Sequence, residues 1–335
     1  MGIKHLNRFL RDNAQSSIKM ISLKELSGKI IAIDISVYMY KYMSENCLLE
    51  NMYLMLATFK YYNIIPVFIF DGKPPEEKKE LLIKRKEDKQ DAENKYNNLK
   101  KLLENKEMDD NEKQDIVNNM DILKKKFVYI SKNHIENVKN LMIAFGATYY
   151  DAPGEADELC AMLVIKNKAW ACLSEDMDMF VYGCTRVLRY LSLLNHTVVL
   201  YDTIEILNQL NITQKELREI CVISGTDYNK CLDNKCLDNK CVPLYKTLDY
   251  FKKYHNENDA NNEKDDKLCF YDWLREKTDY ITDYDNLIKI CNIFELNDYN
   301  ISHLKRFETI KIMNGLIMPD TIKNIIKGEG FIFPL

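Results

Sequence analysis

Seven acidic residues stand where apolar runs end or where the following helix-like segments begin. They are Asp34, Asp71, Glu155, Asp157, Asp176, Asp178 and Asp227. A single aspartate at such a place is most often a helix N-cap or a turn residue. Seven at topologically equivalent positions instead predict that the carboxylates gather at one site.

Gathered carboxylates need positive charge beside them, because like charges repel and raise one another's pKa. Oxygen-only ligands suit Mg²⁺ or Mn²⁺ rather than Zn²⁺. Two such ions about 4 Å apart can activate a water molecule and stabilise the leaving oxygen of a phosphodiester. The seven residues therefore predict two Mg²⁺ ions, with Mn²⁺ as a substitute, and phosphodiester hydrolysis.

The spacing of two acidic pairs restricts where they can lie. Glu155/Asp157 and Asp176/Asp178 are i,i+2 pairs, whose side chains diverge inside a regular helix. They converge only at a strand–helix junction, and Pro153–Gly154 marks such a junction before the first pair. We therefore expect both pairs to straddle the start of a helix.

Apolar runs alternate with helix-like segments through the first 230 residues. Predicted strands cover 29–36, 64–72, 147–151, 169–176, 186–191 and 197–202, and predicted helices cover 131–145, 154–167 and 213–224. The segment between the first two strands is helix-like apart from a loop near 44–46. This alternation predicts an α/β fold with a mostly parallel central sheet flanked by helices. Such a sheet places its site beyond the carboxyl ends of the strands.

The stretch from 76 to 126 has no glycine or proline and is dense in charged and amide side chains. It predicts one or two long helices that project from the sheet. The alternative is a charged hairpin that merely covers the core. Between 73 and 101, ten Lys and Arg stand against seven Asp and Glu, so this part of an acidic protein is locally basic.

The overall composition is that of an ordinary globular protein, with 46% hydrophobic and 29% charged residues. The formal net charge of −4 argues against nucleic acid as a partner. However, the rest of the protein carries a net positive charge when the seven site carboxylates are left out of the sum. No apolar run approaches the roughly 20 residues of a membrane span, and the N-terminus lacks the apolar segment of a signal peptide. The ten cysteines are therefore expected to be reduced thiols in the cytoplasm.

Several short motifs follow one another along the chain: MGIKHL, AIDIS, VFIFDGKPP, DAPGEADELCA, SEDMDMFVYG and SGTDY. In this order and spacing they resemble the flap endonuclease family of structure-specific 5′ nucleases, from Met1 to about residue 230. The resemblance implies a nuclease core over 1–242, in which the insertion at about 76–126 forms a helical arch. A divergent, mostly helical region over 243–335 is expected to pack on this core.

The resemblance also implies roles for particular residues. One ion would be served by Asp34, Asp71, Glu155 and Asp157, and the other by Asp176, Asp178 and Asp227. The family often has a glutamate where this chain has Asp157, so a water-bridged contact is an alternative for that residue.

Further matches concern catalysis and DNA contact. Lys78 and Arg85 match the two catalytic cations, which clamp the scissile phosphate together with the ions held by residues such as Asp34 and Asp71. Their i,i+7 spacing predicts one shared helix face. Gly2 and Tyr40 match positions that contact DNA, Tyr40 by stacking on a base; core packing is the alternative for this tyrosine.

The resemblance implies Mg²⁺-dependent cleavage of DNA with 5′ flaps, ends or junctions, in replication, recombination or repair and with replication proteins as partners. The composition of the chain, rich in Asn, Ile, Lys and Tyr, further resembles that of poxviral members of the family. This resemblance implies viral replication sites in the host cytoplasm. One alternative is a non-catalytic scaffold that binds DNA ends or junctions. A phosphomonoesterase is disfavoured, because Ile35 and Ser36 follow Asp34 where such enzymes have a second aspartate.

A tandem repeat, KCLDNKCLDNKC, covers 230–241 directly after SGTDYN. Family members have a glycine-rich helix–two-turn–helix here, whereas this chain has no glycine between 226 and 314. A zinc site would need a fourth ligand and tighter spacing. We interpret the repeat as a duplication in a surface loop. We expect the contacts of this region with duplex DNA to differ from those of relatives.

Overall fold

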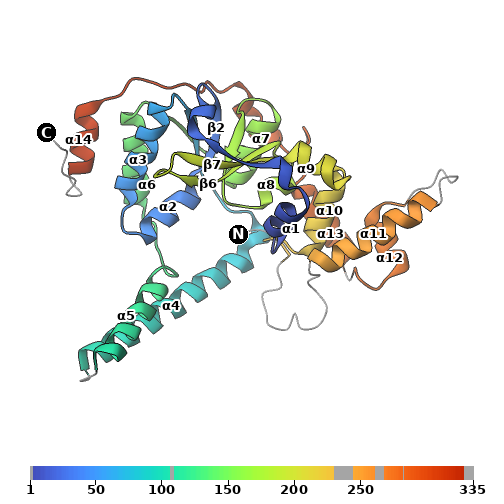
Figure 1. The fold of residues 1–335 in the computed structure, drawn as a ribbon, viewed down its shortest axis with the longest axis horizontal. Coiled ribbons are helices and arrows are strands. Elements are labelled where there is room, and N and C mark those ends of the chain that lie inside the picture. Colours follow the sequence, from blue (N-terminus) through green and yellow to red (C-terminus); the bar gives the residue numbers. More distant parts are fainter. Residues whose placement is uncertain (1–2, 106–108, 230–243, 261–267, 282, 328–335) are drawn as a thin grey trace.

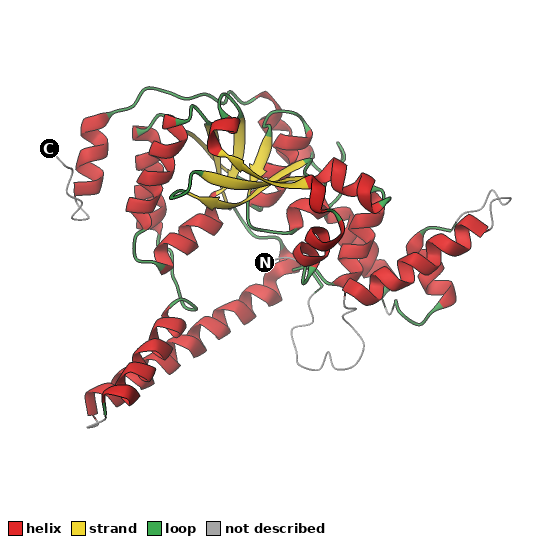
Figure 2. Cartoon of the chain, in the orientation of Figure 1, coloured by secondary structure: helices red, strands yellow, loops and turns green. Residues whose placement is uncertain are grey.

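A seven-stranded sheet forms the centre of the computed structural model, which describes residues 3–105, 109–229, 244–260, 268–281 and 283–327 (Figures 1 and 2). The strands are β1 (Ile18–Ser22), β2 (Ile30–Asp34), β3 (Ile65–Phe70), β4 (Thr148–Asp151), β5 (Ala171–Leu173), β6 (Arg186–Ser192) and β7 (Thr197–Asp202). Their order across the sheet is β1-β7-β6-β5-β2-β3-β4. Strands β2 to β6 are mutually parallel, and β7 and β1 add antiparallel pairs at one edge.

This arrangement confirms the predicted α/β class with a mostly parallel sheet. Strand β1 was not predicted, because its sequence, IKMIS, has no continuous apolar run and its side chains are half-buried or exposed. Met20, for example, is 74% exposed. Pairing with β7, which sets Ile18 opposite Tyr201, holds this segment as an edge strand.

Helices cover both faces of the sheet, so the central strands are buried on both sides. On one face lie α2 (Ile35–Ser44), α3 (Leu48–Tyr61), α6 (Lys132–Ala144) and α14 (Pro319–Lys327); on the other lie α1 (Leu6–Asn13), α7 (Ala156–Ile165), α8 (Asp178–Tyr182), α9 (Thr203–Leu210) and α10 (Gln214–Ser224). In β2, Ile31 and Ile33 pack with the helices of the α2 face, and Ala32 packs with those of the α7 face. Burial on both faces explains why this strand is a continuous apolar run.

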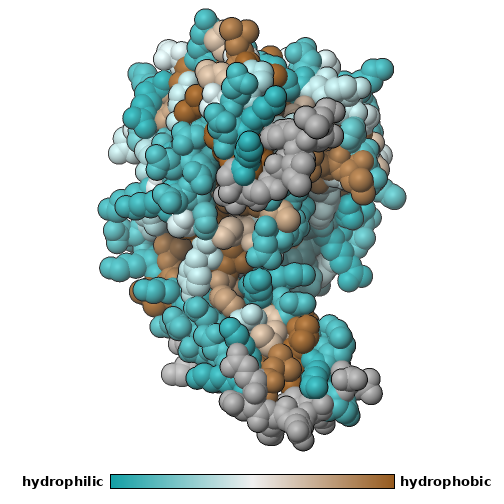
Figure 3. Space-filling view, turned by 90° about the vertical axis from the view of Figure 1, so that its left-hand side faces the viewer, coloured by the Kyte–Doolittle hydropathy of each residue, from teal (hydrophilic) through white to brown (hydrophobic). Residues whose placement is uncertain are grey.

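The charged stretch forms two helices that project away from the sheet (Figure 1). A short 3₁₀ turn, η3 (Glu76–Lys78), leads into α4 (Lys79–Asn105), which packs against α5 (Asp110–Lys124). The surface of this projection is mostly hydrophilic with a small apolar strip (Figure 3). The prediction of long projecting helices is therefore correct, whereas their action as an arch over DNA stays a prediction.

The C-terminal elements contact several elements of the core. Helix α10 contacts α11 (Leu244–Ala260), α12 (Phe270–Lys277) and α13 (Tyr284–Ile293), and α7 contacts the 3₁₀ segment η5 (Ser302–Thr309). The chain then passes the end of α6 and the turn before β4, where Gly315 N donates to Gly146 O at 2.6 Å and Met318 N donates to Ala144 O at 2.7 Å. Helix α14 then packs on α6. The predicted division at 242/243 lies outside the described residues.

None of the described helices is both long and apolar enough to cross a membrane.

Glu219 on α10 should make the protein less stable as the pH rises from about 4.5 to about 7. Burial is the main cause that raises the pKa of this carboxyl from 4.5 to about 7, and the Lys215 ammonium at 3.9 Å only partly offsets it. The unfolded chain ionises Glu219 more easily, so the free energy of unfolding falls across this window and stays low above it. Glu219→Gln should add about 1–3 kcal/mol at pH 8 and almost nothing at pH 4.

Thermal unfolding followed by circular dichroism at both pH values measures this difference. The matched control is Glu87→Gln, which changes a solvent-exposed glutamate on α4. Equal effects of the two substitutions at pH 8 would contradict the role of burial at Glu219.

Candidate active site

The carboxyl ends of three adjacent parallel strands form the base of the candidate site. Strand β2 ends at Asp34, while β3 ends just before Asp71 and β5 just before Ser174. Because β2 pairs with both β3 and β5, Asp34 lies at the centre of this edge. The prediction that the acids follow the strand ends holds here.

Asp34 is a buried carboxylate held by two serines. It caps α2 by accepting from Ser36 N at 3.2 Å, and its other oxygen accepts from Ser174 Oγ at 3.2 Å. Burial, followed by the charges of Asp71 and Asp176, raises the pKa of Asp34 to about 7. The fold thus holds an anion where ionisation is unfavourable unless positive charge is present. The sequence did not predict that either serine contacts Asp34.

Two loops that carry site acids are hydrogen-bonded to each other. Gly72 N donates to Gly154 O at 2.7 Å. The preceding Asp71 accepts from Ala156 N at 2.9 Å and from Ser36 Oγ at 2.5 Å. A Cβ at position 72 would lie 2.0 Å from Ala152 O. Only glycine therefore lets the loop after β3 approach the loop after β4 this closely.

Gly72→Ala should push these loops apart and misplace Asp71. We expect a loss of about 1–3 kcal/mol of stability and about a 100-fold fall in activity, since displacements near 1 Å can cost that much. Gly154→Ala is the matched control, because a Cβ there meets only Glu158 Oε2 at an ordinary 3.7 Å. Melting temperature and cleavage rate measure both effects. Equal behaviour of the two variants would contradict the close-approach requirement.

Both i,i+2 pairs straddle the start of a helix, as predicted. Glu155 is the N-cap of α7 and Asp157 lies in its first turn. Asp178 opens α8 and donates its backbone N–H to Asp176 Oδ1 at 3.0 Å. The backbone at Asp176 is fixed in turn by Ser174 Oγ at 3.1 Å.

Asp157 lies between the two predicted groups of metal ligands. Burial, and then the charges of Asp34, Asp176 and Asp178, raise the pKa of Asp157 well above its ordinary value. Its Oδ1 is buried and has no hydrogen-bond partner among the described residues. The shorter side chain at this position therefore still points a carboxylate oxygen into the cluster.

Asp227 lies on a different kind of element from the one predicted. It follows helix α10, not a strand, in a turn that Gly225 enters with a φ of 105°. Its carboxylate is 3% exposed and pairs with Arg85 Nη2 of α4 at 2.6 Å. The projecting hairpin and the α10 turn meet through this ion pair. The expectation that each of the seven acids ends a strand or opens a helix was wrong for Asp227.

Lys78 and Arg85 do not share one α-helix as predicted, because Lys78 ends the 3₁₀ turn before α4 and Arg85 lies within α4. The Lys78 side chain is nevertheless directed into the site, and Nζ lies 2.7 Å from the Glu155 carboxylate. Burial disfavours its charge, but Glu155, Asp178 and Asp157 outweigh burial and raise the pKa of Lys78. Both predicted cations thus contact site carboxylates through separate elements.

Tyr40 is 45% exposed, so core packing does not account for it. The ammonium of Lys89 lies 4.8 Å from the centre of its ring, and Asp71 contributes after burial to the raised pKa of its hydroxyl. An exposed ring beside the carboxylates suits base stacking, which stays a prediction. Gly2 lies outside the described residues, as does the repeat at 230–241.

The donor set fits hard divalent cations, although the carboxylates are not arranged as a preformed binding site. Among the described residues, no three His, Cys, Asp or Glu side chains are grouped in a way that could hold a metal ion. Instead, Lys78 and Arg85 neutralise Glu155 and Asp227. The oxygen-only donors and the unpaired Oδ1 of Asp157 favour Mg²⁺ or Mn²⁺. Side-chain rearrangement would accompany binding.

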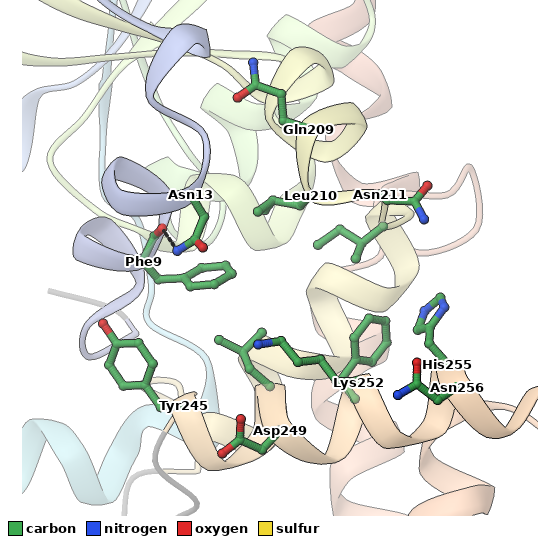
Figure 4. A pocket seen from close by; sticks show the side chains of 13 residues that line it. Phe9, Asn13, Gln209, Leu210, Asn211, Tyr245, Asp249, Lys252, His255 and Asn256 are labelled. Carbon is green, nitrogen blue, oxygen red and sulfur yellow. Dashed lines mark hydrogen bonds between the residues drawn. The ribbon is translucent and has the colours of Figure 1, made fainter.

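A separate cavity of about 660 Å³ lies between α1, α9 and α11 (Figure 4). Phe9, Leu210 and Phe251 contribute apolar walls, and Asn13 and His255 contribute polar groups. None of the seven site carboxylates is among the described residues that line it, so this cavity is distinct from the candidate site.

Acidic residues lie at the carboxyl ends of the parallel strands, and two basic residues from the start of the projecting hairpin contact site carboxylates. Two family models match the chain: the XPG N-terminal domain over residues 1–92 and the XPG I-region over residues 146–227. The chain therefore belongs to the flap endonuclease family, which confirms the resemblance seen in its motifs.

Similar curated proteins include Flap endonuclease 1-A of Sorghum bicolor, 32% identical over 247 residues, and Flap endonuclease 1 of Zea mays, 31% identical over 247 residues. Each alignment covers 68% of this chain and 62% of the relative, so the match spans less than two thirds of the relatives' length. The poxviral likeness and the cytoplasmic location stay predictions.

Solved structures share the fold. The catalytic core of Rad2 in complex with DNA substrate aligns with a TM-score of 0.64 at 22% identity, covering 98% of this chain and 95% of that chain. Human GEN1 in complex with Holliday junction DNA gives 0.56 at 17% identity, covering 98% and 73%. Flap endonuclease-1 from Methanococcus jannaschii gives 0.53 at 20% identity, covering 93% and 97%.

Proposed function

We propose that this protein is a Mg²⁺-dependent, structure-specific nuclease that hydrolyses phosphodiester bonds in DNA with 5′ flaps, ends or junctions. The observation that supports it most is the mutual proximity of buried carboxylates beside two cations from the projecting hairpin. Burial, followed by the charges of Asp71 and Asp176, raises the pKa of Asp34. Burial, followed by the charges of Asp34, Asp176 and Asp178, raises the pKa of Asp157. The family relationship supports the same reaction.

Each part of the site has a defined task in this proposal. Bound divalent cations would supply an activated water molecule and stabilise the leaving oxygen. Ser36 and Ser174 hold Asp34 in place. Lys78 and Arg85 can exchange their carboxylate partners for the scissile phosphate and offset the charge that develops on it.

A non-catalytic scaffold for DNA ends or junctions is the second candidate. It would need the basic hairpin but would gain nothing from several buried carboxylates, whose burial without compensating charge is unfavourable. The phosphomonoesterase alternative finds no support, because Ser36 stands where such enzymes have a second aspartate, and its hydroxyl donates to Asp71 Oδ2.

The proposed cellular role is viral DNA replication, recombination or repair in the host cytoplasm, together with replication proteins. This part rests on the sequence resemblance alone.

The test uses the full chain on labelled 5′-flap, nicked, single-stranded and junction DNA, with Mg²⁺ or with a chelator. We expect Mg²⁺-dependent cleavage that prefers one or more branched substrates over single-stranded DNA. Tight binding to the branched substrates without cleavage at any Mg²⁺ or Mn²⁺ concentration would instead support the scaffold.

A further inference from the structure

Tyr228, the residue after Asp227, contacts both the acidic and the basic part of the site. Its hydroxyl donates to Glu155 Oε2 at 2.7 Å. The ammonium of Lys78, which binds the same carboxylate, lies 4.6 Å from the centre of the Tyr228 ring. One side chain thus orients Glu155 through a hydrogen bond and Lys78 through a cation–π contact.

The ring of Tyr228 is held in turn by the C-terminal region. Phe294, which follows α13 and is 0% exposed, meets this ring edge-to-face at 5.3 Å and an interplanar angle of 87°. Phe294 also packs on Tyr182 at 4.8 Å. Such edge-to-face pairs prefer a defined geometry, so Phe294 restricts the rotation of the Tyr228 ring.

A cavity of about 620 Å³ beside Glu155 shows a second link to the C-terminal region. Tyr182 and Tyr228 line one part of it, and residues that follow α13, including Asn300 and His303, line another. His303 Nε2 lies 3.1 Å from Oε2 of Glu158, in the first turn of α7. The divergent C-terminal third therefore forms part of the wall next to a predicted metal ligand.

We propose that Tyr228 is a positioning residue for the proposed reaction, and that Phe294 makes its position depend on the C-terminal region. Tyr228 anchors the Glu155 carboxylate within the site, which limits the rearrangement that this carboxylate needs to bind a divalent cation, and keeps Lys78 against the same site. This inference rests on the proposed nuclease function, but the metal-binding role of Tyr228 can be measured without cleavage.

The central variant is Tyr228→Phe, which keeps the ring, the packing on Phe294 and the cation–π contact but removes the donor to Glu155. The matched control is Tyr284→Phe, which removes a hydroxyl that donates to Asp272 Oδ1 at 2.8 Å, between α12 and α13. Mn²⁺ affinity is measured by electron paramagnetic resonance, and single-turnover cleavage is measured across a Mg²⁺ titration. DNA binding is measured in Ca²⁺, and melting temperature without metal.

We expect Tyr228→Phe to weaken Mn²⁺ binding and to raise the half-saturating Mg²⁺ concentration, each by about 10- to 100-fold, as when partners that orient metal ligands are lost. DNA affinity and melting temperature should stay close to those of Tyr284→Phe. Phe294→Leu should shift Mn²⁺ affinity in the same direction by a smaller factor, because the Tyr228 ring then loses its restraint.

Unchanged Mn²⁺ affinity in Tyr228→Phe, or no Mn²⁺ binding by the unaltered protein, would overturn the inference. A Phe294→Leu variant that melts earlier but binds Mn²⁺ normally would overturn the link to the C-terminal region. If the unaltered protein binds Mn²⁺ and Tyr228→Phe weakens that binding, yet no DNA is cleaved, the proposed function fails while the role of Tyr228 stands.

Discussion

Asp34→Asn is expected to lower the single-turnover cleavage rate by roughly 1,000-fold or more, which corresponds to about 4 kcal/mol of lost transition-state stabilisation. The same change should not destabilise the fold in the absence of metal. Burial and two neighbouring carboxylates disfavour the charge of Asp34, and the neutral amide keeps an oxygen that can accept from Ser36 N or Ser174 Oγ. If the variant melts at the same or a higher temperature but does not cleave DNA, the Asp34 carboxylate serves catalysis and not stability.

The controls for this prediction concern DNA binding and contamination. Affinity for branched DNA in Ca²⁺ should change only a few-fold, because Asp34 is 4% exposed. Cleavage that survives both Asp34→Asn and Asp176→Ala would come from a contaminating enzyme. Cleavage lost together with a large drop in melting temperature would show that Asp34 is structural.

Lys78→Met should reduce cleavage about 100-fold and also destabilise the protein. The first effect follows because fixed charges that offset transition-state charge contribute on this scale. The second follows because Lys78 is 6% exposed and its removal leaves Glu155 in a mostly buried place without its cation. Methionine keeps the length of the aliphatic stem, so the change isolates the ammonium. Single-turnover kinetics and thermal unfolding measure the two effects.

Lys86→Met is the matched control, because it removes the same charge from a solvent-exposed position on α4. It should alter cleavage by no more than a few-fold, through weaker general attraction to DNA. Equal losses in both variants would mean that the hairpin acts only through its overall charge. Arg85→Ala should resemble Lys78→Met in rate and should also destabilise the protein, because it leaves the Asp227 carboxylate, which is 3% exposed, without the Arg85 guanidinium.

The fold could be predicted where burial leaves a strong pattern in the sequence. Strands β2 and β3 are buried on both faces and therefore read as unbroken apolar runs. Strand β1 lies at an edge, where half-buried and exposed side chains leave no such run, and only its pairing with β7 makes it a strand.

The residues of the candidate site likewise differ in how far the sequence alone could place them. Acids at strand ends and at helix starts, such as Asp34 and Asp157, could be found because local sequence specifies these junctions. Asp227 follows α10 and not a strand, contrary to the prediction, and its role as a metal ligand stays a prediction. The roles predicted for Gly2 and for the repeat at 230–241 stay predictions.

By itself, the sequence determined the residue types of the site and the parallel sheet that gathers them, because both depend on local periodicity and on short-range junctions. Only the tertiary structure decided which groups touch. Glu155 meets Lys78 and Tyr228 across separations of 77 and 73 residues, and Arg85 meets Asp227 across 142. Phe294, from a region without a recognisable motif, packs on Tyr228 at 5.3 Å. Such contacts follow from the packing of whole elements, and residues far apart in the chain leave no shared pattern in a single sequence.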